Sequence, residues 1–411
     1  MQDVLVLGGG PAGLTLALAL HRAGIPCRVF EAAPEIRAVG VGVNILPHAA
    51  AVLHGLGLEA GLAARAVQTS QSYFFNRFGQ LIHQEPLGRA AGYPAPQYSI
   101  HRADLQTVLL DAACERLGTE RIQLGHKVAR VEQEADAAVV HFEGGRRPAR
   151  GMAAIACDGI HSVVRRQLHP HEKGFRYSGY NMWRGVTRWP RFLNGAPMVR
   201  AGWLKTGKMV IYPIRDNIDA EGRQLVNWVA EVETPQHLDR DWNRPGRLED
   251  FLPLFADWHF DWLDVPAMLR AADTVLEFPM VDQDPLPWWT QGRITLLGDA
   301  AHPMVPRGSN GAGQAILDTV TLAEKLQQGG PVEAALRAYE AERLPATAAV
   351  VLRNRSNPPD AILREVHERT GDRPFARIED VISREELLNL TDGYKQVAGY
   401  TMEDVRRRTA G

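Results

Sequence analysis

The stretch Val4-Leu5-Val6-Leu7-Gly8-Gly9-Gly10-Pro11-Ala12-Gly13 decides the fold of the first part of this chain. An apolar run typical of a buried strand leads into glycines at G-x-G-x-x-G spacing, and an apolar helical run follows over residues 14–23. Gly8 permits a tight turn, Gly10 lets the backbone approach a pyrophosphate, and Gly13 lets helix and strand pack closely. The first N–H groups of the helix and the positive end of its dipole then face phosphate oxygens.

A carboxylate completes this unit at the end of the next strand. The run Arg28-Val29-Phe30 closes at Glu31, 23 residues after Gly8, where a carboxylate can accept hydrogen bonds from a ribose. A tight glycine turn that binds nothing is the alternative. Because strand, glycine loop, helix and acid occur together here, the sequence predicts a dinucleotide-binding unit of the Rossmann type.

The composition is that of an ordinary globular protein. The chain has 411 residues, of which 45% are hydrophobic and 23% charged, enough for a large core or two domains. A formal net charge of −2 gives no field that would attract nucleic acid or an anionic membrane. The apolar helical run at 14–23 is too short to span a bilayer. We therefore expect no nucleic-acid or membrane partner, and a monomer or a homodimer.

The cysteines indicate a reducing compartment. The three of them, Cys27, Cys114 and Cys157, show neither C-x-x-C spacing nor a disulfide framework. Thiols of this kind stay reduced in a cytoplasm. The first strand begins almost at Met1, which leaves no room for a signal peptide. We expect a cytoplasmic protein without a metal site.

A glycine-bearing loop and a second long helix follow the first unit. The loop at 34–44 suggests backbone lying against a flat or bulky group, with Arg37 placed to meet a phosphate; a plain connection is the alternative. The helix predicted to end near residue 117 carries Arg102 and Gln106 one turn apart on one face, so both can address one ligand. For Arg102, an exposed helical salt bridge is the alternative.

Two kinds of strand follow. Residues 128–133 and 137–142 form a predicted hairpin, and the apolar run 153–157 leads into Asp158-Gly159 before a helix at 163–168. From about residue 174, aromatic and β-branched runs separated by turns predict antiparallel strands of a second layer. Those strands are expected at 180–186, 209–213 and 225–232, with a helix at 248–260 and a proline-rich connection at 279–289.

A second strand–glycine loop–helix device lies near the end of the folded core. Residues 293–297 read as a buried strand that ends in Gly298-Asp299, and a loop rich in proline and glycine precedes a helix at 314–326. Asp299 can hold a polyol hydroxyl, and the helix start can polarise a carbonyl. Two ligand-facing edges so far apart in sequence suit a long dinucleotide such as FAD. His302 is either a general base or, preferably, an anchor of this loop.

With these residues in hand, the sequence resembles the single-component flavoprotein aromatic hydroxylases, the class of p-hydroxybenzoate hydroxylase. The resemblance rests on GGGPAG with Glu31, on CDGIHSVVR at 157–165 and on GDAAHPMVPRGSNGAG at 298–313. The stretches EIRAVGVGVNILP, MWRGVT and DWNRPGRLEDFLPLFADW are more similar to the phenazine-modifying members that act on 5-methylphenazine-1-carboxylate.

The resemblance implies an α/β fold and a reaction. The Rossmann-like FAD-binding domain would be interleaved with an antiparallel-sheet substrate domain and followed by a helical tail. The enzyme would use FAD, NAD(P)H and O2 to hydroxylate an electron-rich aromatic or N-heteroaromatic molecule, one that can be anionic, through a flavin C4a-hydroperoxide. An FAD oxidase or reductase that inserts no oxygen, and a colourless binding protein on the same scaffold, are the alternatives. A flavin halogenase would need a W-x-W-x-I-P motif, which this sequence lacks.

The resemblance also assigns residues to the cofactor. Glu31 would hold the adenosine ribose, Arg102 and Asp299 the pyrophosphate and ribityl chain, and Asp158-Gly159 both FAD and the nicotinamide donor. The loop 306–312 would lie against the isoalloxazine ring. Gly313 stands where members often carry Asn. The full set of expected FAD-binding residues is Gly8, Gly10, Pro11, Ala12, Gly13, Glu31, Ala32, Arg37, Gly42, Val43, Arg102, Gln106, Val128, Asp158, Gly159, Asp299, Pro306, Gly308, Gly311 and Ala312.

The substrate site is expected between that loop and the second layer. Arg307 must find a carboxylate in the protein or an anionic group on a ligand, because an unpaired buried guanidinium is costly; pointing to solvent is the alternative. No catalytic residue is certain, and Pro306 and Arg307 are the candidates. Aromatic residues in the strands either pack in the core or line the pocket. The substrate candidates are Trp183, Arg184, Tyr212, Trp228, Phe278 and Arg307.

The expected organisation interleaves two domains. The FAD-binding domain would comprise residues 1–72, 99–173 and 288–350, and the substrate domain 73–98 and 174–287. The charged helical tail at 351–411, which lies outside the family motifs, is expected on the surface or in a dimer contact.

Overall fold

A five-stranded parallel sheet forms the centre of the larger part of the molecule. The computed structural model describes residues 2–36, 40–234 and 244–409, so Arg37 lies outside the described residues. All neighbouring strands of this sheet run parallel, and their apolar runs are buried, as expected for a sheet covered on both faces. The strand order is β21 (Ile294–Leu296), β12 (Ala153–Ala156), β1 (Val4–Leu7), β2 (Cys27–Phe30) and β8 (Ile122–Gln123).

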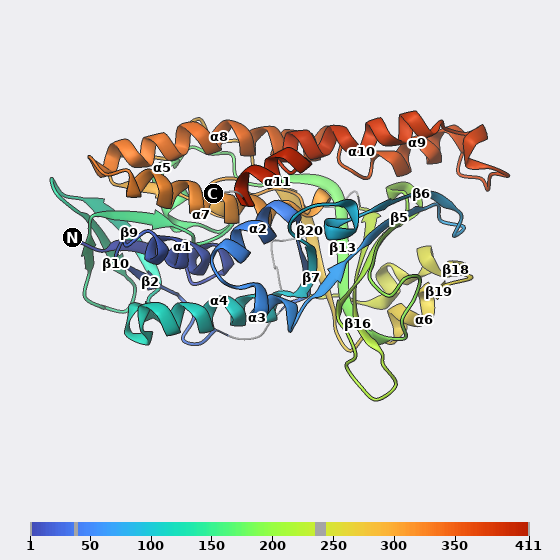
Figure 1. Ribbon diagram of the computed structural model, residues 1–411, viewed down its shortest axis with the longest axis horizontal. Coiled ribbons are helices and arrows are strands. Elements are labelled where there is room, and N and C mark those ends of the chain that lie inside the picture. Colours follow the sequence, from blue (N-terminus) through green and yellow to red (C-terminus); the bar gives the residue numbers. More distant parts are fainter. Residues whose placement is uncertain (1, 37–39, 235–243, 410–411) are drawn as a thin grey trace.

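Helices and a small antiparallel sheet cover the parallel sheet. Helix α1 (Pro11–Arg22) contacts both α4 (Arg102–Leu117) and α7 (Gly311–Gln327), and α8 (Val332–Ser356) packs on α7 (Figure 1). The small sheet packs against β1 and β12, and α5 (Val163–Leu168) lies against its first strand. Its strands are β9 (Val128–Gln133), β10 (Ala138–Phe142) and β11 (Ala149–Gly151).

The predicted second layer is an eight-stranded sheet. Its neighbouring strands are antiparallel except for one parallel pair, β14 with β5. The α/β fold class with its antiparallel second layer is therefore confirmed, whereas the exact division into domains stays a prediction. The strand order is β17 (Arg244–Pro245), β20 (Val275–Asp282), β13 (Arg176–Trp189), β16 (Gln224–Glu233), β15 (Lys208–Arg215), β14 (Pro197–Gly202), β5 (Gln71–Phe75) and β6 (Leu81–Pro86).

A three-stranded sheet connects the two parts. It consists of β3 (Gly42–Ile45), β7 (Gln97–His101) and β4 (Val67–Thr69), with β7 in the middle. Helix α2 (Pro47–Gly55) starts directly after β3 and packs on α7. Since β7 also contacts β15, this sheet holds the large sheet against the nucleotide-binding part.

One predicted element was wrong, and another begins later than predicted. Residues 248–260 form short 3-10 turns, η4 (Leu248–Asp250) and η5 (Leu252–Phe255), and the short strand β18 (His259–Phe260), not one helix. Pro253 interrupts the helical pattern there. The predicted connection 279–289 begins inside β20, where Pro279 sits beside an irregularity in the pairing with β13, a place that tolerates proline.

The C-terminal tail is helical, as predicted, and each of its α-helices packs on another element. Helix α9 (Ala361–Thr370) packs on β5 and β14, α10 (Arg384–Ala398) on α8, and α11 (Met402–Thr409) on α2. Figure 1 shows α10 and α9 continuing the side of the molecule along which α8 lies. Apolar residues of α9 and α10 share a core with strands β5 and β6: Phe74, Ile82, Ile362, Leu363, Val366 and Leu387. One face of each of these helices is apolar and buried, while a surface or dimer-contact role for the tail stays a prediction.

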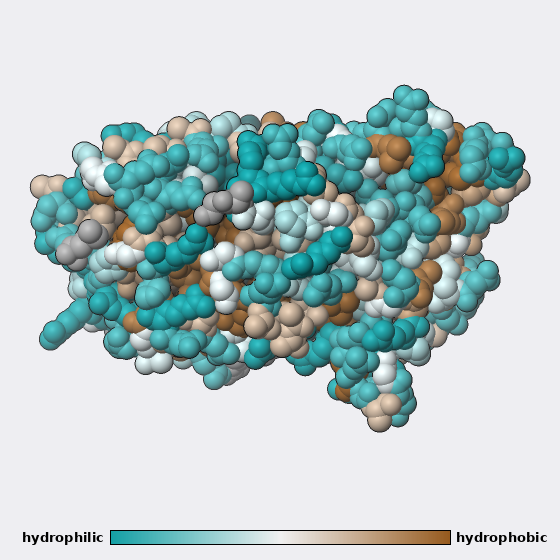
Figure 2. Space-filling view, viewed as in Figure 1, coloured by the Kyte–Doolittle hydropathy of each residue, from teal (hydrophilic) through white to brown (hydrophobic). Residues whose placement is uncertain are grey.

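The exterior gives no sign of a membrane segment. Among the described residues, none of the helices is both long and apolar enough to cross a bilayer. Hydrophilic residues dominate the face shown in Figure 2, with smaller apolar patches over α9 and α10.

Candidate functional site

The first glycine loop has the geometry that its spacing predicts. A Cβ on Gly8 would lie 2.3 Å from the carbonyl oxygen of Cys157, and one on Gly13 only 1.9 Å from that of Gly8. Both glycines are therefore required by close backbone packing. A Cβ on Gly10 would have no described atom within 4 Å. Gly10 thus borders open space at the start of α1, where a ligand can approach the backbone.

Residues from two other segments converge on this loop. The carboxylate of Glu31 accepts hydrogen bonds from the backbone N–H of Gly9 (2.6 Å) and of Ala33 (2.8 Å). The side-chain amide of Gln106 donates to the Gly9 carbonyl oxygen at 3.1 Å. Arg102 begins α4 one turn before Gln106 and is exposed. The predicted ribose acid and Gln106 of α4 thus meet at the glycine loop.

The loop after β12 contributes an unused acceptor. One oxygen of Asp158, Oδ2, accepts a hydrogen bond from the Val163 N–H at 2.9 Å, while Oδ1 is buried and has no hydrogen-bond partner in the described part of the chain. Burial raises the pKa of the Asp158 carboxyl, although local hydrogen bonds oppose it. Gly159, with φ of +75°, again borders open space. A ligand hydroxyl would fit this orphaned oxygen.

The second loop brings an acid and a helix N-terminus to the same edge. Asp299 follows β21 and is exposed, and its Oδ1 lies 4.0 Å from where a Cβ on Gly311 would be. Helix α7 starts at Gly311, and Asn310 before it makes no side-chain cap within the described structure. Its first N–H groups therefore remain available to a ligand.

These loops share one edge because β1, β12 and β21 are parallel neighbours, so that their carboxyl ends meet. A Cβ on Gly298 would lie 3.4 Å from that of Ala12, which shows how closely the loops approach. Open glycine backbone, free helix N–H groups and acids at both ends fit a two-headed dinucleotide. Three further expected residues lie in strands: Gly42 and Val43 belong to β3, and Val128 begins β9. His126, two residues before Val128, donates its backbone N–H to the Glu31 carbonyl oxygen.

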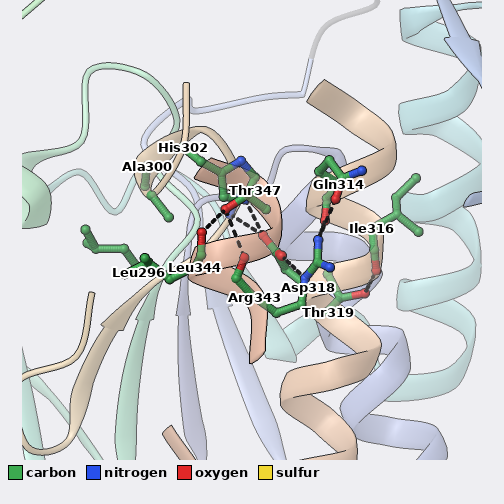
Figure 3. Close-up of polar contacts among 12 residues, drawn as sticks. Leu296, Ala300, His302, Gln314, Ile316, Asp318, Thr319, Arg343, Leu344 and Thr347 are labelled. Carbon is green, nitrogen blue, oxygen red and sulfur yellow. Dashed lines mark hydrogen bonds and ion pairs between the residues drawn. The ribbon is translucent and has the colours of Figure 1, made fainter. Parts of the chain in front are cut away.

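A buried ionic network anchors the second loop (Figure 3). Asp318 of α7 accepts from His302 Nε2 at 2.6 Å, from Arg343 Nε at 2.7 Å and from the Gly298 N–H at 3.1 Å. Burial opposes ionisation of Asp318, but His302 and Arg343 outweigh it and hold its pKa below the ordinary value. His302 is thus engaged in the structure, which supports the anchor interpretation over a general base.

Arg184, a predicted substrate residue, is engaged by the protein. Its Nη2 donates to the Gly42 carbonyl at 2.7 Å, and the Gly42 N–H donates to Asn227 Oδ1 at the same distance. Both side chains come from one face of the large sheet, so that face clamps the start of β3. Burial raises the pKa of the neighbouring Tyr212 phenol, while Arg184 and Asn44 oppose the increase.

Two of the predicted pocket aromatics face the other way. Trp183 and Trp228 are buried in the core beneath the sheet, where Trp183 stacks on Phe251 at 5.1 Å between ring centroids. Side chains alternate along a strand, so Trp183 and Arg184 cannot share a face. The pocket assignment of the two tryptophans is therefore corrected to core packing. Tyr212 and Phe278 do lie on the face of Arg184.

Arg307 points inward, so the solvent-facing alternative was wrong. Its side chain is 9% exposed, its Nε lies 3.9 Å from Glu231 Oε2, and its guanidinium lies 5.1 Å from the Tyr180 ring centroid. Glu231 also pairs with Lys208 Nζ at 2.8 Å. Arg307 is thus paired with a carboxylate of the protein, which is one of the two alternatives expected for a buried guanidinium.

This contact joins Arg307 to a larger buried cluster. Lys208 also pairs closely with Asp360, from the tail, and Asp360 lies 3.2 Å from Arg200 Nε. Burial opposes ionisation of Asp360, but Lys208 and Arg200 hold its pKa below the ordinary value. Sequence reasoning missed these residues; the available signal was a charged residue in the apolar strands at 208–215 and 224–233.

A small cavity adjoins the cluster and the second loop. Its volume is about 60 Å3, and its walls include Arg200, Gly308 and Ser309. Helix α10 and the segment after it add Thr391, Lys395 and Tyr400. The tail therefore closes a cavity directly beside the loop assigned to the cofactor.

Comparison with known proteins agrees with this geometry. The family model described as an FAD binding domain matches residues 1–238 and 278–354. The chain is 41% identical over 404 residues to the phenazine 1,6-dicarboxylic acid hydroxylase PhzS of Lysobacter antibioticus, covering 96% of this chain and 97% of the relative. It is 36% identical to the 3-amino-4-hydroxybenzoate 2-monooxygenase of Streptomyces cremeus, covering 96% and 95%.

A solved structure is similar over the whole chain. Klebsiella pneumoniae HpxO, crystallised with FAD and uric acid, superposes with a TM-score of 0.77 at 25% identity and covers 100% of this chain and 98% of that one. The relatives match almost the entire chain, so the tail is part of what the chain shares with them, whereas the family model ends at residue 354, in line with a tail outside the family motifs.

The two glycine geometries predict separable effects on folding and FAD binding. Gly10→Ala places a methyl group in open space, so the melting temperature of the FAD-free protein should stay unchanged. Its FAD dissociation constant should rise about tenfold or more, the equivalent of one charge-assisted hydrogen bond. Gly13→Ala serves as the comparison, since its methyl group collides with the Gly8 carbonyl and should lower the melting temperature. Fluorescence titration with FAD and thermal melts measure the two quantities, and equal melting losses in both variants would contradict the distinction.

The Asp318 network predicts a pH-dependent stability contribution. Asp318→Asn should reduce the free energy of unfolding by about 3 kcal/mol or more at pH 7, because it leaves the buried Arg343 guanidinium without its carboxylate. Since the folded-state pKa is lowered, wild type has this stabilisation in full above about pH 4 and loses it as the pH falls further. The gap between wild type and variant should therefore shrink in acid.

Urea titrations at pH 7 and below pH 4 measure this gap. Asp111→Asn, at an exposed position of α4, is the control and should change stability by less than about 0.5 kcal/mol. A gap of constant size at both pH values would show that ionisation of Asp318 does not matter.

Proposed function

The chain belongs to the FAD-binding family of aromatic monooxygenases, and from that premise we propose that its substrate is an aromatic carboxylate. The enzyme uses FAD, NAD(P)H and O2 to hydroxylate a small aromatic compound. The two relatives above are named for acids, a phenazine dicarboxylic acid and a hydroxybenzoate. A fused N-heteroaromatic acid, such as a phenazine carboxylate, is the class that this similarity favours.

The charge balance of the buried cluster carries the proposal. Within the described residues, three cations, Arg200, Lys208 and Arg307, face two carboxylates, Glu231 and Asp360, which leaves one positive charge. A buried charge without a partner is costly, whereas a ligand anion would compensate it. The carboxylate of the substrate would supply that anion.

One of the cations, Arg200, lines the cavity beside Gly308 and Ser309, where Glu85 is paired with Lys395 at 2.9 Å. Arg307 does not line it, but its Nη2 is buried and has no hydrogen-bond partner among the described residues. At about 60 Å3 the cavity can hold a carboxylate but not a fused ring system. The ring would then extend toward Tyr212 and Phe278, the predicted aromatics that lie on this face of the sheet.

The cofactor assignments remain part of the proposal. When bound and reduced by NAD(P)H, FAD would activate O2, which supplies the oxygen atom. Glu31 would hold the ribose, Asp299 the ribityl chain, and the N-terminus of α7 the flavin carbonyl side. The chain's own task is to orient the aromatic ring and to exclude water from it. Pro306 is exposed at the start of this loop, where it can contact ring or flavin.

We further propose a cytoplasmic location, which the free state of Cys27, Cys114 and Cys157 supports. A monomer or a homodimer remains the prediction for the oligomeric state.

The substrate class predicts a difference between acids and amides. Aromatic and N-heteroaromatic carboxylic acids should stimulate NAD(P)H oxidation and acquire one oxygen atom from O2, whereas the matching carboxamides should bind at least about tenfold more weakly, because they cannot neutralise the cluster. Oxygen-18 incorporation, followed by mass spectrometry, measures the reaction. If the amides were equally good substrates, the carboxylate proposal would be wrong.

We expect the preference for acids over amides to depend on Arg307. Arg307→Met should raise KM for the acid about tenfold or more, erase the preference for acid over amide, and leave KM for NAD(P)H unchanged. Arg307→Lys is the control, since it keeps the positive charge and should retain part of the preference. A change confined to the NAD(P)H constant would assign Arg307 to the nicotinamide donor instead.

A further inference from the structure

Helix α10 of the tail contacts the second loop through one fully buried tyrosine. The Tyr394 hydroxyl donates to Asn354 Oδ1 of α8 at 2.8 Å and accepts from Asn310 Nδ2 at 3.1 Å. A Cβ on Gly308 would lie 2.1 Å from the same hydroxyl oxygen. The loop backbone therefore packs directly onto the Tyr394 hydroxyl group.

The loop needs such support, because its backbone is unusual at two consecutive residues. Gly308 has φ of +78°, and Ser309 has φ of +56°, a conformation that costs free energy for a residue with a Cβ. Asn44 of β3 donates to Ser309 Oγ at 3.3 Å from the other side. The loop is thus held between β3 and the tail.

Further contacts fix α10 and the segment after it against the start of α7. Gln314 Nε2 donates to the Ala398 carbonyl at 2.9 Å. The Tyr400 ring stacks on His48 at 5.5 Å between centroids, and a Cβ on Gly313 would lie 2.9 Å from His48 Nε2. Loop and helix start, the two features assigned to the flavin, both rest on the tail.

We propose that Tyr394 is a positioning residue that holds the Gly308–Asn310 backbone in the conformation that receives the flavin. The inference depends on FAD binding, which the family establishes, and on the assignment of residues 306–312 to the flavin ring. It does not depend on the substrate being a carboxylate. The tail thereby becomes part of the cofactor site.

The chemistry of a phenol suits this position. A hydroxyl can donate one hydrogen bond and accept another, and Tyr394 does both, to and from different elements. Burial raises the pKa of the Tyr394 phenol, so it remains a donor throughout the working range of pH. Phenylalanine would fill the same volume and would lack both bonds.

The test compares Tyr394→Phe with Tyr339→Phe. Tyr339 of α8 is equally buried, and its hydroxyl donates one hydrogen bond at 3.1 Å to the carbonyl of Leu296 in β21, well before the Gly308–Asn310 segment in the sequence. The control measures what loss of a buried tyrosine hydroxyl does to folding alone. For each variant, the FAD dissociation constant of the FAD-free protein, the absorption spectrum of bound flavin, the melting temperature and the fraction of reductant released as H2O2 are measured.

We expect Tyr394→Phe to raise the FAD dissociation constant about three- to tenfold, to change the flavin spectrum and to increase H2O2 release. Tyr339→Phe should lower the melting temperature by a similar amount and leave the other three quantities unchanged. If both variants behave alike in FAD affinity, spectrum and H2O2 release, Tyr394 has only a structural role and the inference is overturned.

Asn310→Ala removes the loop's partner in the hydrogen bond from Asn310 to Tyr394 and leaves the tail sequence unchanged. This variant keeps the inference testable if Tyr394→Phe fails to fold. It should reproduce the change in FAD affinity, and in the double variant the two effects should not add. If Asn310→Ala weakens FAD binding and Tyr394→Phe does not, the tail is not involved. If neither does, the assignment of the loop to the flavin is wrong.

Discussion

The site depends on a buried carboxylate that must never be without its partners. Asp318 is fully buried, and a lone charge there would be prohibitive, so the network holds only while His302, Arg343 and the Gly298 N–H all reach it. These partners come from α8, from the end of β21 and from the loop that follows. Because the loss of any of these contacts is costly, Gly298 and His302 are held in place, and so is Asp299 between them in the sequence. The contacts of the buried Asp318 thereby determine the position of the exposed Asp299.

Features that rest on local backbone chemistry could be predicted from the sequence. The spacing of Gly8, Gly10 and Gly13 determines a turn, an open approach and a close packing within a few residues, and the structure has all three. Asp299 and the start of α7, which follow β21, could be predicted in the same way. The parallel sheet then brings these local devices together, since βαβ units place the carboxyl ends of their strands at one edge.

Features that rest on distant partners could not be predicted in this way. The hairpin order of the large sheet decides that Lys208 faces Glu231, and only the folded tail adds Asp360 to them. The assignment of Trp183 and Arg184 to one pocket was avoidable, because adjacent residues of a strand point to opposite faces. The contribution of the tail to a core could not be predicted, because its many charged residues alternate with the apolar ones that complete a core with Phe74 and Ile82.

The buried cations of the large sheet need carboxylate partners, and this need explains why the tail packs where it does. Lys208 and Arg200 emerge from one face of the large sheet, so two cations would be buried there with Glu231 alone. Asp360, at the residue preceding α9, brings the second carboxylate, and only a docked tail can deliver it. Docking in turn places α10 against the loop that ends at Asn310. The charge balance of the cluster, tail docking and loop conformation are therefore linked through one set of contacts, and a change in that balance should alter the conformation of the loop.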